Sequence, residues 1–199
     1  GKSTLLNVVA GLEEATEGEV ILDGKKVSGP GADRVVMFQE SALFPWLTVE
    51  ENVRFGMKMA GMPEEEQEKR LDKYLSMVQL SDFRKYYPHE ISGGMKQRTA
   101  LARALVLDSQ VLLMDEPFSA LDKQTINILR TELENIWEKT GKTILFITHS
   151  VEEAVYFADR VVILSDNPGE IKDIIPIDLP RPRQIDDDAF IHLRGKILK

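Results

Sequence analysis

The chain has 199 residues, enough for one sizeable hydrophobic core, and it carries a formal net charge of −8. This acidic balance argues against a general nucleic-acid binder, which would normally present a basic face. Cysteine is absent, which excludes disulfides and thiol chemistry, and no apolar run approaches the roughly 20 residues that a membrane-spanning helix needs. We therefore expect any link to a membrane to run through a partner.

The first residues of the sequence suggest a phosphate site. Gly1-Lys2-Ser3-Thr4 match the second half of the phosphate-binding loop G-x-x-x-x-G-K-[ST]. The apolar run LLNVVAGL follows at helical spacing and ends at Gly11. A lysine and hydroxyls at a helix start suit a triphosphate–magnesium complex. We expect the sequence to begin inside this loop, without the first half of the loop or the strand before it.

The next segments are predicted to be extended. Residues 18–24 should form a strand and a tight turn, best explained as a structural hairpin. Residues 35–38 form a second strand that ends at Gln39. The loop at 43–49 is the most apolar in the chain, and two interpretations of Phe44 and Trp46 stay open: burial in the local core, or exposure at an interface.

Two helices are predicted after this loop. Thr48 and Glu51 form a capping box ahead of an apolar run over residues 53–60. Pro63 opens a second helix that ends near residue 79, with three glutamates at its positive end. The acidic run is therefore a solvated helix start and not a metal site. Together with residues 81–87, these helices predict a small helical subdomain.

The segment from residue 91 to residue 122 combines an anion site with two acids. Ser92-Gly93-Gly94 precede a helical run, and adjacent glycines leave the first N–H groups open to a phosphate. Residues 111–114 are an apolar run, as expected of a strand buried on both faces, and they lead into Asp115-Glu116. In open α/β sheets ligands bind outside the carboxyl ends of the strands, so these carboxylates should lie at a ligand site.

The rest of the chain continues the alternation. A long amphipathic helix should run from Asp122 to Thr140 and stop at Gly141. Residues 143–147 are predicted to be a buried strand, which ends in Thr148-His149 and places His149 beside the acids if the sheet is parallel. Strands at 159–165 and 171–177 should flank a turn at 167–169, and residues 186–198 should form a closing helix of no derived role. The other histidines, His89 and His192, are expected at the surface.

Three motifs in this order carry a resemblance to a known family. SGGMKQR, LLMDEP and SALD resemble the signature motif, Walker B and D-loop of an ABC-type ATPase, although Met95 stands where the consensus signature has glutamine. The resemblance implies an α/β phosphate-loop NTPase fold, a mostly parallel sheet flanked by helices, with an inserted α-helical subdomain and an antiparallel β portion. It implies one ABC ATPase domain over 1–199, with 48–90 extending to about 107 as the helical signature subdomain and 122–199 completing the RecA-like core.

The resemblance also implies a site for ATP and Mg²⁺. Gly1 belongs to the phosphate loop, Lys2 reaches the β- and γ-phosphates, Ser3 ligates the metal and Thr4 touches the α-phosphate. The metal is also contacted by Gln39 and, through water, by Asp115.

For hydrolysis, the resemblance implies Glu116 as the general base that polarises the attacking water. Gln39 contacts that water, and His149 holds the γ-phosphate or orients the water. These three residues are the predicted catalytic set.

A second copy of the chain is implied by the same family. Ser92, Gly93 and Gly94 bind the γ-phosphate of ATP that is held by the partner, and Asp122 lies at the seam. We therefore expect a homodimer with its nucleotides at the interface.

The surroundings of the chain are inferred from softer similarities. LFPWLTVEENV and the DLPRPR segment at 178–183 resemble the subfamily that imports nitrate, sulfonates and taurine. By this resemblance the 43–49 region contacts transmembrane permease subunits, a solute-binding protein takes part indirectly, and the protein lies peripherally on the cytoplasmic face of the cell membrane. The alternatives are a soluble ABC-class ATPase not coupled to transport, or a nucleotide-binding regulatory protein without turnover.

Overall fold

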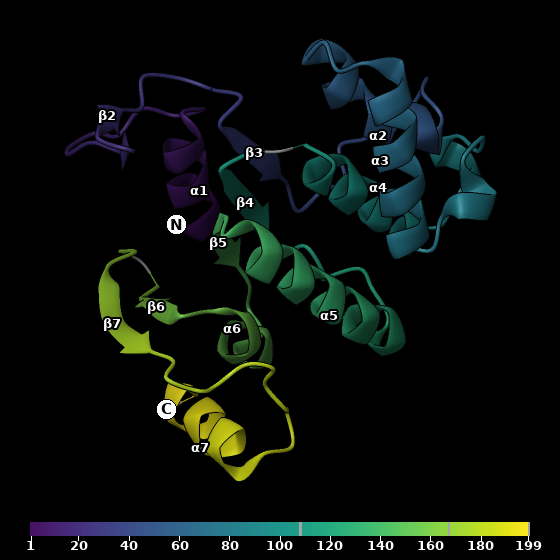
Figure 1. The fold of residues 1–199 in the computed structure, drawn as a ribbon. Helices are drawn as coiled ribbons and strands as arrows, with labels where there is room; N and C mark the ends of the chain where they lie inside the picture. The colour runs from purple at the N-terminus through teal and green to yellow at the C-terminus, as the bar shows by residue number, and fades with distance from the viewer. Residues whose placement is uncertain (108, 167, 199) are drawn as a thin grey trace.

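The structure, a computed structural model, describes residues 1–107, 109–166 and 168–198. It has two parts, which Figure 1 shows side by side: a sheet with its covering helices, and a group of helices over residues 48–107 that we call the helical lobe. The lobe contains α2 (Val49–Met59), α3 (Glu64–Met77), α4 (Gly93–Leu105) and the short 3-10 helices Ser81–Phe83 and Pro88–Glu90.

A parallel sheet of three strands forms the centre of the first part. β4 (Val111–Asp115) lies between β3 (Arg34–Met37) and β5 (Thr143–Ile147), and every residue of β4 is buried, as its apolar run predicts. Since all three strands run the same way, their carboxyl ends meet at one edge of the sheet. The residues that follow β3, β4 and β5 therefore leave the sheet together.

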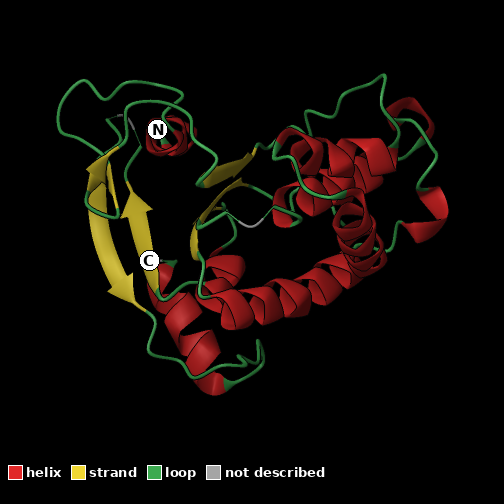
Figure 2. Cartoon of the chain, turned by 45° about the horizontal axis from the view of Figure 1, so that its top comes forward, coloured by secondary structure: helices red, strands yellow, loops and turns green. Residues whose placement is uncertain are grey.

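The two faces of the sheet are covered by different helices because side chains alternate along a strand. On one face Val111 and Leu113 pack with Leu6 and Ala10 of α1 (Lys2–Ala10). On the other face Leu112 and Met114 join a larger core that includes residues of α4 and α5 (Lys123–Thr140): Ala100, Leu101, Ala104, Leu105, Leu129, Leu133 and Ile136. Figure 1 shows α1 and α5 on opposite sides of the sheet, and Figure 2 shows α5 extending from the sheet towards the helical lobe.

Local sequence signals explain the helices of the lobe. Thr48 accepts a hydrogen bond from the Glu51 amide, and the Glu51 carboxylate accepts one from the Thr48 amide at 2.8 Å, so the capping box is confirmed. With this cap α2 begins at Val49, earlier than the predicted apolar run at 53–60. Pro63 precedes α3, and this helix buries Leu71 and Leu75.

The predicted antiparallel portion consists of two separate hairpins. β1 (Ile21–Leu22) pairs with β2 (Lys25–Lys26), and β6 (Arg160–Leu164) pairs with β7 (Ile171–Pro176). The turn expected at 167–169 includes Asn167, which lies outside the described residues. α6 (Val151–Phe157) precedes β6, and α7 (Asp188–Ile197) is the predicted closing helix.

One strand differs from its prediction. Residues 143–147 were expected to be buried, but only Ile147 is buried, Thr143 is exposed and the residues between them are half-buried. The reason is that β5 pairs with β4 alone among the described strands, so one long side of β5 carries no further strand.

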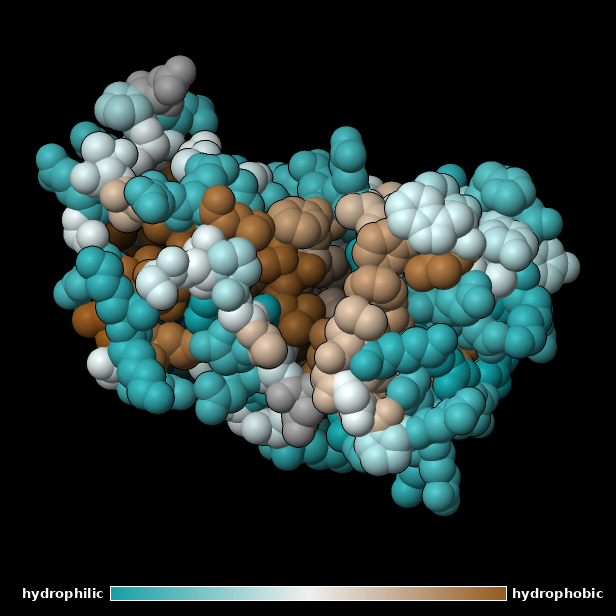
Figure 3. Space-filling view, turned by 90° about the horizontal axis from the view of Figure 1, so that it is seen from above, coloured by the Kyte–Doolittle hydropathy of each residue, from teal (hydrophilic) through white to brown (hydrophobic). Residues whose placement is uncertain are grey.

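Viewed from above, apolar side chains gather in a hollow across the middle of the molecule, with hydrophilic side chains around it (Figure 3). None of the described helices is both long and apolar enough to cross a membrane.

Candidate active site

Three polar side chains meet at the carboxyl edge of the sheet. Glu116 follows β4, Gln39 follows β3 closely and His149 follows β5. Gln39 Nε2 donates a hydrogen bond to Glu116 Oε2 at 3.2 Å, and His149 Nδ1 lies 3.2 Å from the same oxygen. One carboxylate oxygen is thus shared by an amide and an imidazole that come from the two neighbouring strands. The predicted proximity of His149 to the acids is therefore found in the structure.

The backbone at Glu116 turns the chain out of the sheet. Its φ is +47°, a left-handed conformation that few residues other than glycine adopt. The Glu116 amide donates to the Ile147 carbonyl at 2.9 Å, and the Glu116 carbonyl accepts from the Ser119 amide at 3.2 Å and hydroxyl at 3.1 Å. These contacts hold the strained conformation, and such strain is concentrated at functional sites. The Glu116 side chain is 18% exposed, and that of His149 is 70% exposed, so the pair is open to a ligand from solvent.

Asp115 differs from its neighbour in its surroundings. It is 7% exposed, and no described residue donates a hydrogen bond to its carboxylate. Within the described parts of the chain no group of three or more histidine, cysteine, aspartate or glutamate side chains could hold a metal by itself. Magnesium, however, usually takes one or two carboxylates and completes its shell with water and phosphate. A largely buried carboxylate at the end of β4, to which no described residue donates a hydrogen bond, fits one position of such a shared site.

The first turn of α1 is open to solvent. Gly1, Lys2, Ser3 and Thr4 are all exposed, while Leu6 anchors the helix in the core. α1 packs against β4 and β5, and its first turn lies towards the carboxyl end of β5 in Figure 1. Gly11 ends the helix with a φ of +76°. The helix start, which carries Lys2 and the hydroxyl groups of Ser3 and Thr4, therefore lies on the side where the strands end.

The second predicted anion site lies elsewhere. Ser92 caps α4 by accepting a hydrogen bond from the Met95 amide at 3.2 Å, and Ser92 and Gly93 are exposed. Gly94 packs closely on the D-loop segment, because a Cβ there would lie 3.3 Å from the Ala120 carbonyl oxygen. No hydrogen bond or ion pair between described residues joins Ser92, Gly93 or Gly94 to the group around Glu116. Their exposure leaves them accessible to another molecule.

Asp122 caps the following helix. Its carboxylate accepts hydrogen bonds from the Thr125 hydroxyl at 2.7 Å and the Thr125 amide at 3.0 Å. These bonds, the hydroxyl one first, hold the pKa of Asp122 below its usual value. Asp122 is exposed, and it lies two residues after Ala120, whose carbonyl oxygen packs against Gly94.

The open question about the apolar loop at 43–49 has a different answer for each aromatic residue. Trp46 is 70% exposed, whereas Phe44 is half-buried, with its ring centre 4.6 Å from that of Phe55 and 5.7 Å from that of Trp46. Phe55 and Met59, both on α2, are exposed too, at 37% and 71%. The loop and α2 therefore share an exposed apolar surface.

Two residues that position this loop could not be identified from the sequence. Asn52 is fully buried on α2, donates to the Phe44, Leu47 and Thr48 carbonyls and accepts from the Phe44 amide at 2.8 Å. Arg103 of α4 donates to the carbonyls of residues 41 and 42 at 2.9 and 3.0 Å, and its burial lowers its pKa. Each of these two polar side chains lies among apolar residues of a predicted helix, which could have indicated a buried polar contact. The sequence does not show which carbonyls accept their hydrogen bonds, because most of these carbonyls lie in another segment.

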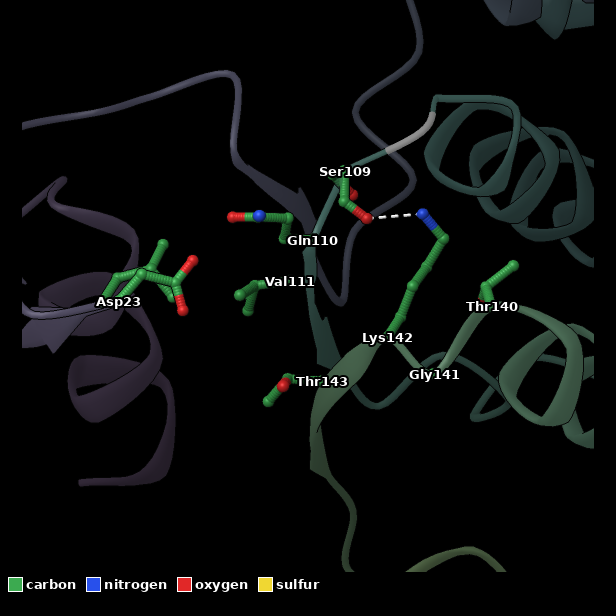
Figure 4. A pocket seen from close by; sticks show the side chains of 9 residues that line it. Asp23, Ser109, Gln110, Val111, Thr140, Gly141, Lys142 and Thr143 are labelled. Carbon is green, nitrogen blue, oxygen red and sulfur yellow. Dashed lines mark hydrogen bonds between the residues drawn. The ribbon is translucent and has the colours of Figure 1, made fainter.

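A cavity of about 350 Å³ lies at the opposite end of the sheet. Figure 4 shows its lining, which includes Gln110 and Val111 before and at the start of β4 and Thr143 at the start of β5. Because the strands are parallel, these amino ends are separated from Glu116 and His149 by the length of the strands, about 16 Å for β4. The cavity is therefore not part of the candidate active site.

Comparison with known proteins gives consistent matches. A family model described as ABC transporter matches residues 1–119. The chain is 54% identical over 198 residues to an uncharacterised ABC transporter ATP-binding protein of Methanocaldococcus jannaschii, covering 100% of this chain and 74% of that protein. It is 45% identical over 199 residues to an aliphatic sulfonates import ATP-binding protein of Bacillus cereus, covering 100% and 78%. It is 51% identical over 180 residues to a nitrate import ATP-binding protein of Synechocystis sp., covering 90% and 68%.

Solved structures agree with the sequence matches. A dimeric ATP-binding cassette in a post-hydrolysis state, with ADP and Pi bound, superposes with a TM-score of 0.81 at 34% sequence identity, covering 90% of this chain and 82% of that chain. The fold is accordingly that of a phosphate-loop NTPase, with the parallel sheet between helices, an antiparallel portion and a helical lobe.

Proposed function

The chain belongs to the ABC transporter family, and from this premise we propose that it is the ATP-hydrolysing subunit of an importer for a small anion such as nitrate, a sulfonate or taurine. ATP hydrolysis is characteristic of the family. The observation that carries the proposal is the meeting of Gln39, Glu116 and His149 at one carboxylate oxygen, on the edge of the sheet where phosphate-loop enzymes bind nucleotide. Import of sulfonates and nitrate by relatives supports the direction of transport and the solute class.

The nucleotide would be held at the start of α1. Gly1 and the first N–H groups of the helix face the phosphates, Lys2 pairs with the β- and γ-phosphates, and Thr4 contacts the α-phosphate. Mg²⁺ would be held by Ser3, Gln39 and, through water, Asp115, and it would neutralise charge on the transferred phosphoryl group. The assignment is supported by the Asp115 carboxylate, which is largely buried and accepts no hydrogen bond from the described residues.

Hydrolysis would depend on Glu116 and its two neighbours. Glu116 accepts a proton from the attacking water as the general base, because its carboxylate lies at the strand end and is partly open to solvent. Gln39 orients the water and the metal shell. His149 lies within hydrogen-bonding range of Glu116 and holds the γ-phosphate or orients the same water.

The complete site would need two copies of the chain. Ser92, Gly93 and Gly94 are exposed or half-exposed at the start of α4 and would bind the γ-phosphate of ATP held by the partner, with Asp122 at the seam. A dimeric cassette structure at 34% identity supports this arrangement. In this proposal the helical lobe, residues 48–90 extended to about 107, is the signature subdomain, and 122–199 completes the RecA-like core.

The exposed apolar surface around Trp46 would contact the permease. Phe44, Trp46, Phe55 and Met59 offer aromatic and thioether side chains, which are common at protein interfaces. The permease would hold the chain peripherally on the cytoplasmic face of the membrane, and a solute-binding protein would deliver the anion on the other side.

Reconstitution tests the proposal. The protein is placed with its permease in vesicles, and phosphate release and uptake of nitrate, taurine and an alkanesulfonate are measured with and without ATP. We expect ATP-dependent uptake of one of these anions and phosphate release that depends on Lys2. Phosphate release without any association with the permease would favour a soluble ABC ATPase instead, and ATP binding without phosphate release would favour a regulatory protein.

A further inference from the structure

Arg183 is a buried arginine whose hydrogen-bond partners are backbone carbonyls. It is 5% exposed and ends the DLPRPR segment, residues 178–183, between β7 and α7. No carboxylate of the described residues forms an ion pair with it. Its guanidinium instead donates to five backbone carbonyls, at 2.7 to 3.3 Å: those of Val155, Tyr156, Ala158, Ile177 and Leu179. A planar fork of five N–H donors is the side chain that can satisfy so many acceptors at once.

Most of these carbonyls belong to the end of α6. An α-helix leaves its last carbonyls without a partner inside the helix. At α6, Arg183 Nη1 donates to the carbonyls of 155, 156 and 158, and Arg181 Nη2 donates to the carbonyl of Phe157 at 2.6 Å. Four successive carbonyls are therefore capped by two arginines from another segment. α6 has no basic residue of its own in its last turn, so the arginines also supply the positive charge that this end of a helix favours.

Arg181 links this cap to α5. Its guanidinium lies 4.3 Å from the centre of the Trp137 ring and 3.5 Å from the Glu134 carboxylate, both on α5. A further ion pair at 2.9 Å joins it to Asp159, just after α6. The end of α6 is thus fixed by the DLPRPR segment to the long helix that packs under the sheet.

The other end of α6 fixes the residues on either side of His149. The Thr148 hydroxyl donates to the Glu153 carboxylate at 2.6 Å and accepts from the Ser150 amide at 2.9 Å. Ser150 caps α6 by accepting from the Glu153 amide. Because α6 has only seven residues, about 10 Å of helix separates the two ends. A tilt of so short a helix moves both ends.

We propose that Arg181 and Arg183 are positioning residues for His149: they cap the carboxyl end of α6, fix the axis of that helix, and so hold the imidazole within 3.2 Å of Glu116. This inference rests on the proposed catalytic role of His149. It gives the DLPRPR segment a function in hydrolysis, although the segment does not touch the reacting groups.

A double-mutant cycle in the assembled transporter tests the inference. Arg183→Lys keeps the positive charge but replaces the fork by a single ammonium, which cannot reach carbonyls of both segments. We expect hydrolysis to slow by about tenfold, within the roughly 100-fold that a displacement of about 1 Å at a reacting group can cost. The ATP concentration at half-maximal rate should change less than about twofold, because the phosphate loop is untouched. In a His149→Ala background, Arg183→Lys should have almost no further effect on the rate.

The control is another arginine that contacts α6. Arg194 of α7 lies 3.5 Å from the Glu152 carboxylate on the side of α6 and touches none of the terminal carbonyls. Arg194→Lys should leave the rate unchanged. If Arg183→Lys does not fold, Arg181→Lys, at a less buried position, is expected to show the same dependence on His149 with a smaller effect.

The outcomes separate the two hypotheses. A His149→Ala variant with the parental rate would reject the proposed role of His149 and the inference together. If His149→Ala is slow but the arginine variants have the parental rate, or slow both backgrounds equally, the proposed function stands and the inference is wrong.

Discussion

The sheet edge and the helical lobe treat their polar side chains in opposite ways. At the edge, Gln39 and His149 share one carboxylate oxygen of Glu116, and both of these neighbours are exposed. In the lobe, Arg84 pairs with three carboxylates from α2 and α3, those of Glu50, Glu68 and Asp72. The edge leaves lone pairs and protons available to a ligand, whereas Arg84 and its three carboxylates in the lobe are paired with one another.

This difference indicates a division between chemistry and rigidity. A catalytic carboxylate fully paired with arginines could not serve as a base, so the edge accepts strain at Glu116 and few internal contacts. The helices of the lobe are held to one another by these ion pairs and by a buried apolar core. Substitutions at the edge should therefore change rates, and substitutions in the lobe should change the free energy of unfolding.

The largest expected effect is that of Glu116→Gln. The amide keeps the size of the side chain but cannot accept a proton, so hydrolysis should fall by about 100- to 10,000-fold. ATP binding and the thermal midpoint should stay close to parental values, measured by calorimetry and by circular dichroism. Glu138→Gln, at an exposed acid on α5, is the matched control and should leave the rate unchanged. If Glu116→Gln hydrolysed ATP at the parental rate, the assignment of Glu116 as the general base would be wrong.

The converse effect is expected in the lobe. Leu71 is fully buried on α3, and Leu71→Ala should lower the free energy of unfolding by about 2–5 kcal/mol through lost burial and the cavity left behind. Met59→Ala, at a position 71% exposed on α2, should change it by less than about 0.5 kcal/mol. Urea denaturation measures both. A Leu71→Ala protein of parental stability would show that the lobe does not depend on its core for rigidity.

A third test asks where the sheet side obtains its own rigidity. Gly11 and Gly141 both end helices with a positive φ, +76° and +62°. Alanine at Gly141 meets nothing within 4 Å, so its cost is conformational, about 1 kcal/mol. Alanine at Gly11 would also place its Cβ 2.3 Å from the Gly29 carbonyl oxygen, and backbone must move. We expect Gly11→Ala to cost at least about 1 kcal/mol more than Gly141→Ala in urea denaturation. Equal losses in the free energy of unfolding would mean that the loop at residues 29–31 moves aside without a measurable loss of stability.

The elements that local chemistry determines could be predicted from the sequence. The capping box at Thr48, the left-handed caps at Gly11 and Gly141 and the apolar run of β4 depend on neighbours a few residues away. The proximity of His149 to Glu116 needed one further assumption, a parallel sheet, which the strand register confirms.

Features that depend on distant segments could not be predicted. Phe44 and Trp46 lie two residues apart in one apolar loop, but the half-buried ring of Phe44 contacts Phe55 of α2 and Arg103 of α4, which lie elsewhere in the sequence. Arg183 is charged, which predicts exposure, yet it is buried because a helix end more than 20 residues earlier supplies its acceptors. The exposure of Thr143 follows from the strand order, which no local pattern specifies.

The smallest expected effect is the acid sensitivity of the lobe. Hydrogen bonds from Arg54 and then Arg84 lower the pKa of Glu68, and at Glu50 bonds from Lys85 and Arg84 outweigh burial, which by itself would raise the pKa. A carboxyl whose pKa is lower in the folded state adds stability above its unfolded pKa, about 4.3, and that stability is lost as the pH falls through the folded value. The thermal midpoint should therefore fall as the pH drops below about 4.3, and it should fall less steeply in Glu68→Gln.

Removing the cation provides the check on this mechanism. If the arginines lower the pKa of Glu68, Arg84→Met should make the thermal midpoint fall less steeply with decreasing pH. The pKa of Glu68 then rises towards its unfolded value, so less stability remains to be lost. Both variants should be less stable than the parent at pH 6 by a modest amount, since Glu68 is partly exposed and solvent screens the pair. If the thermal midpoint fell equally steeply with acid in the parent, in Glu68→Gln and in Arg84→Met, these ion pairs would form without stabilising the lobe. The rigidity of the lobe would then rest on the apolar core around Leu71 alone.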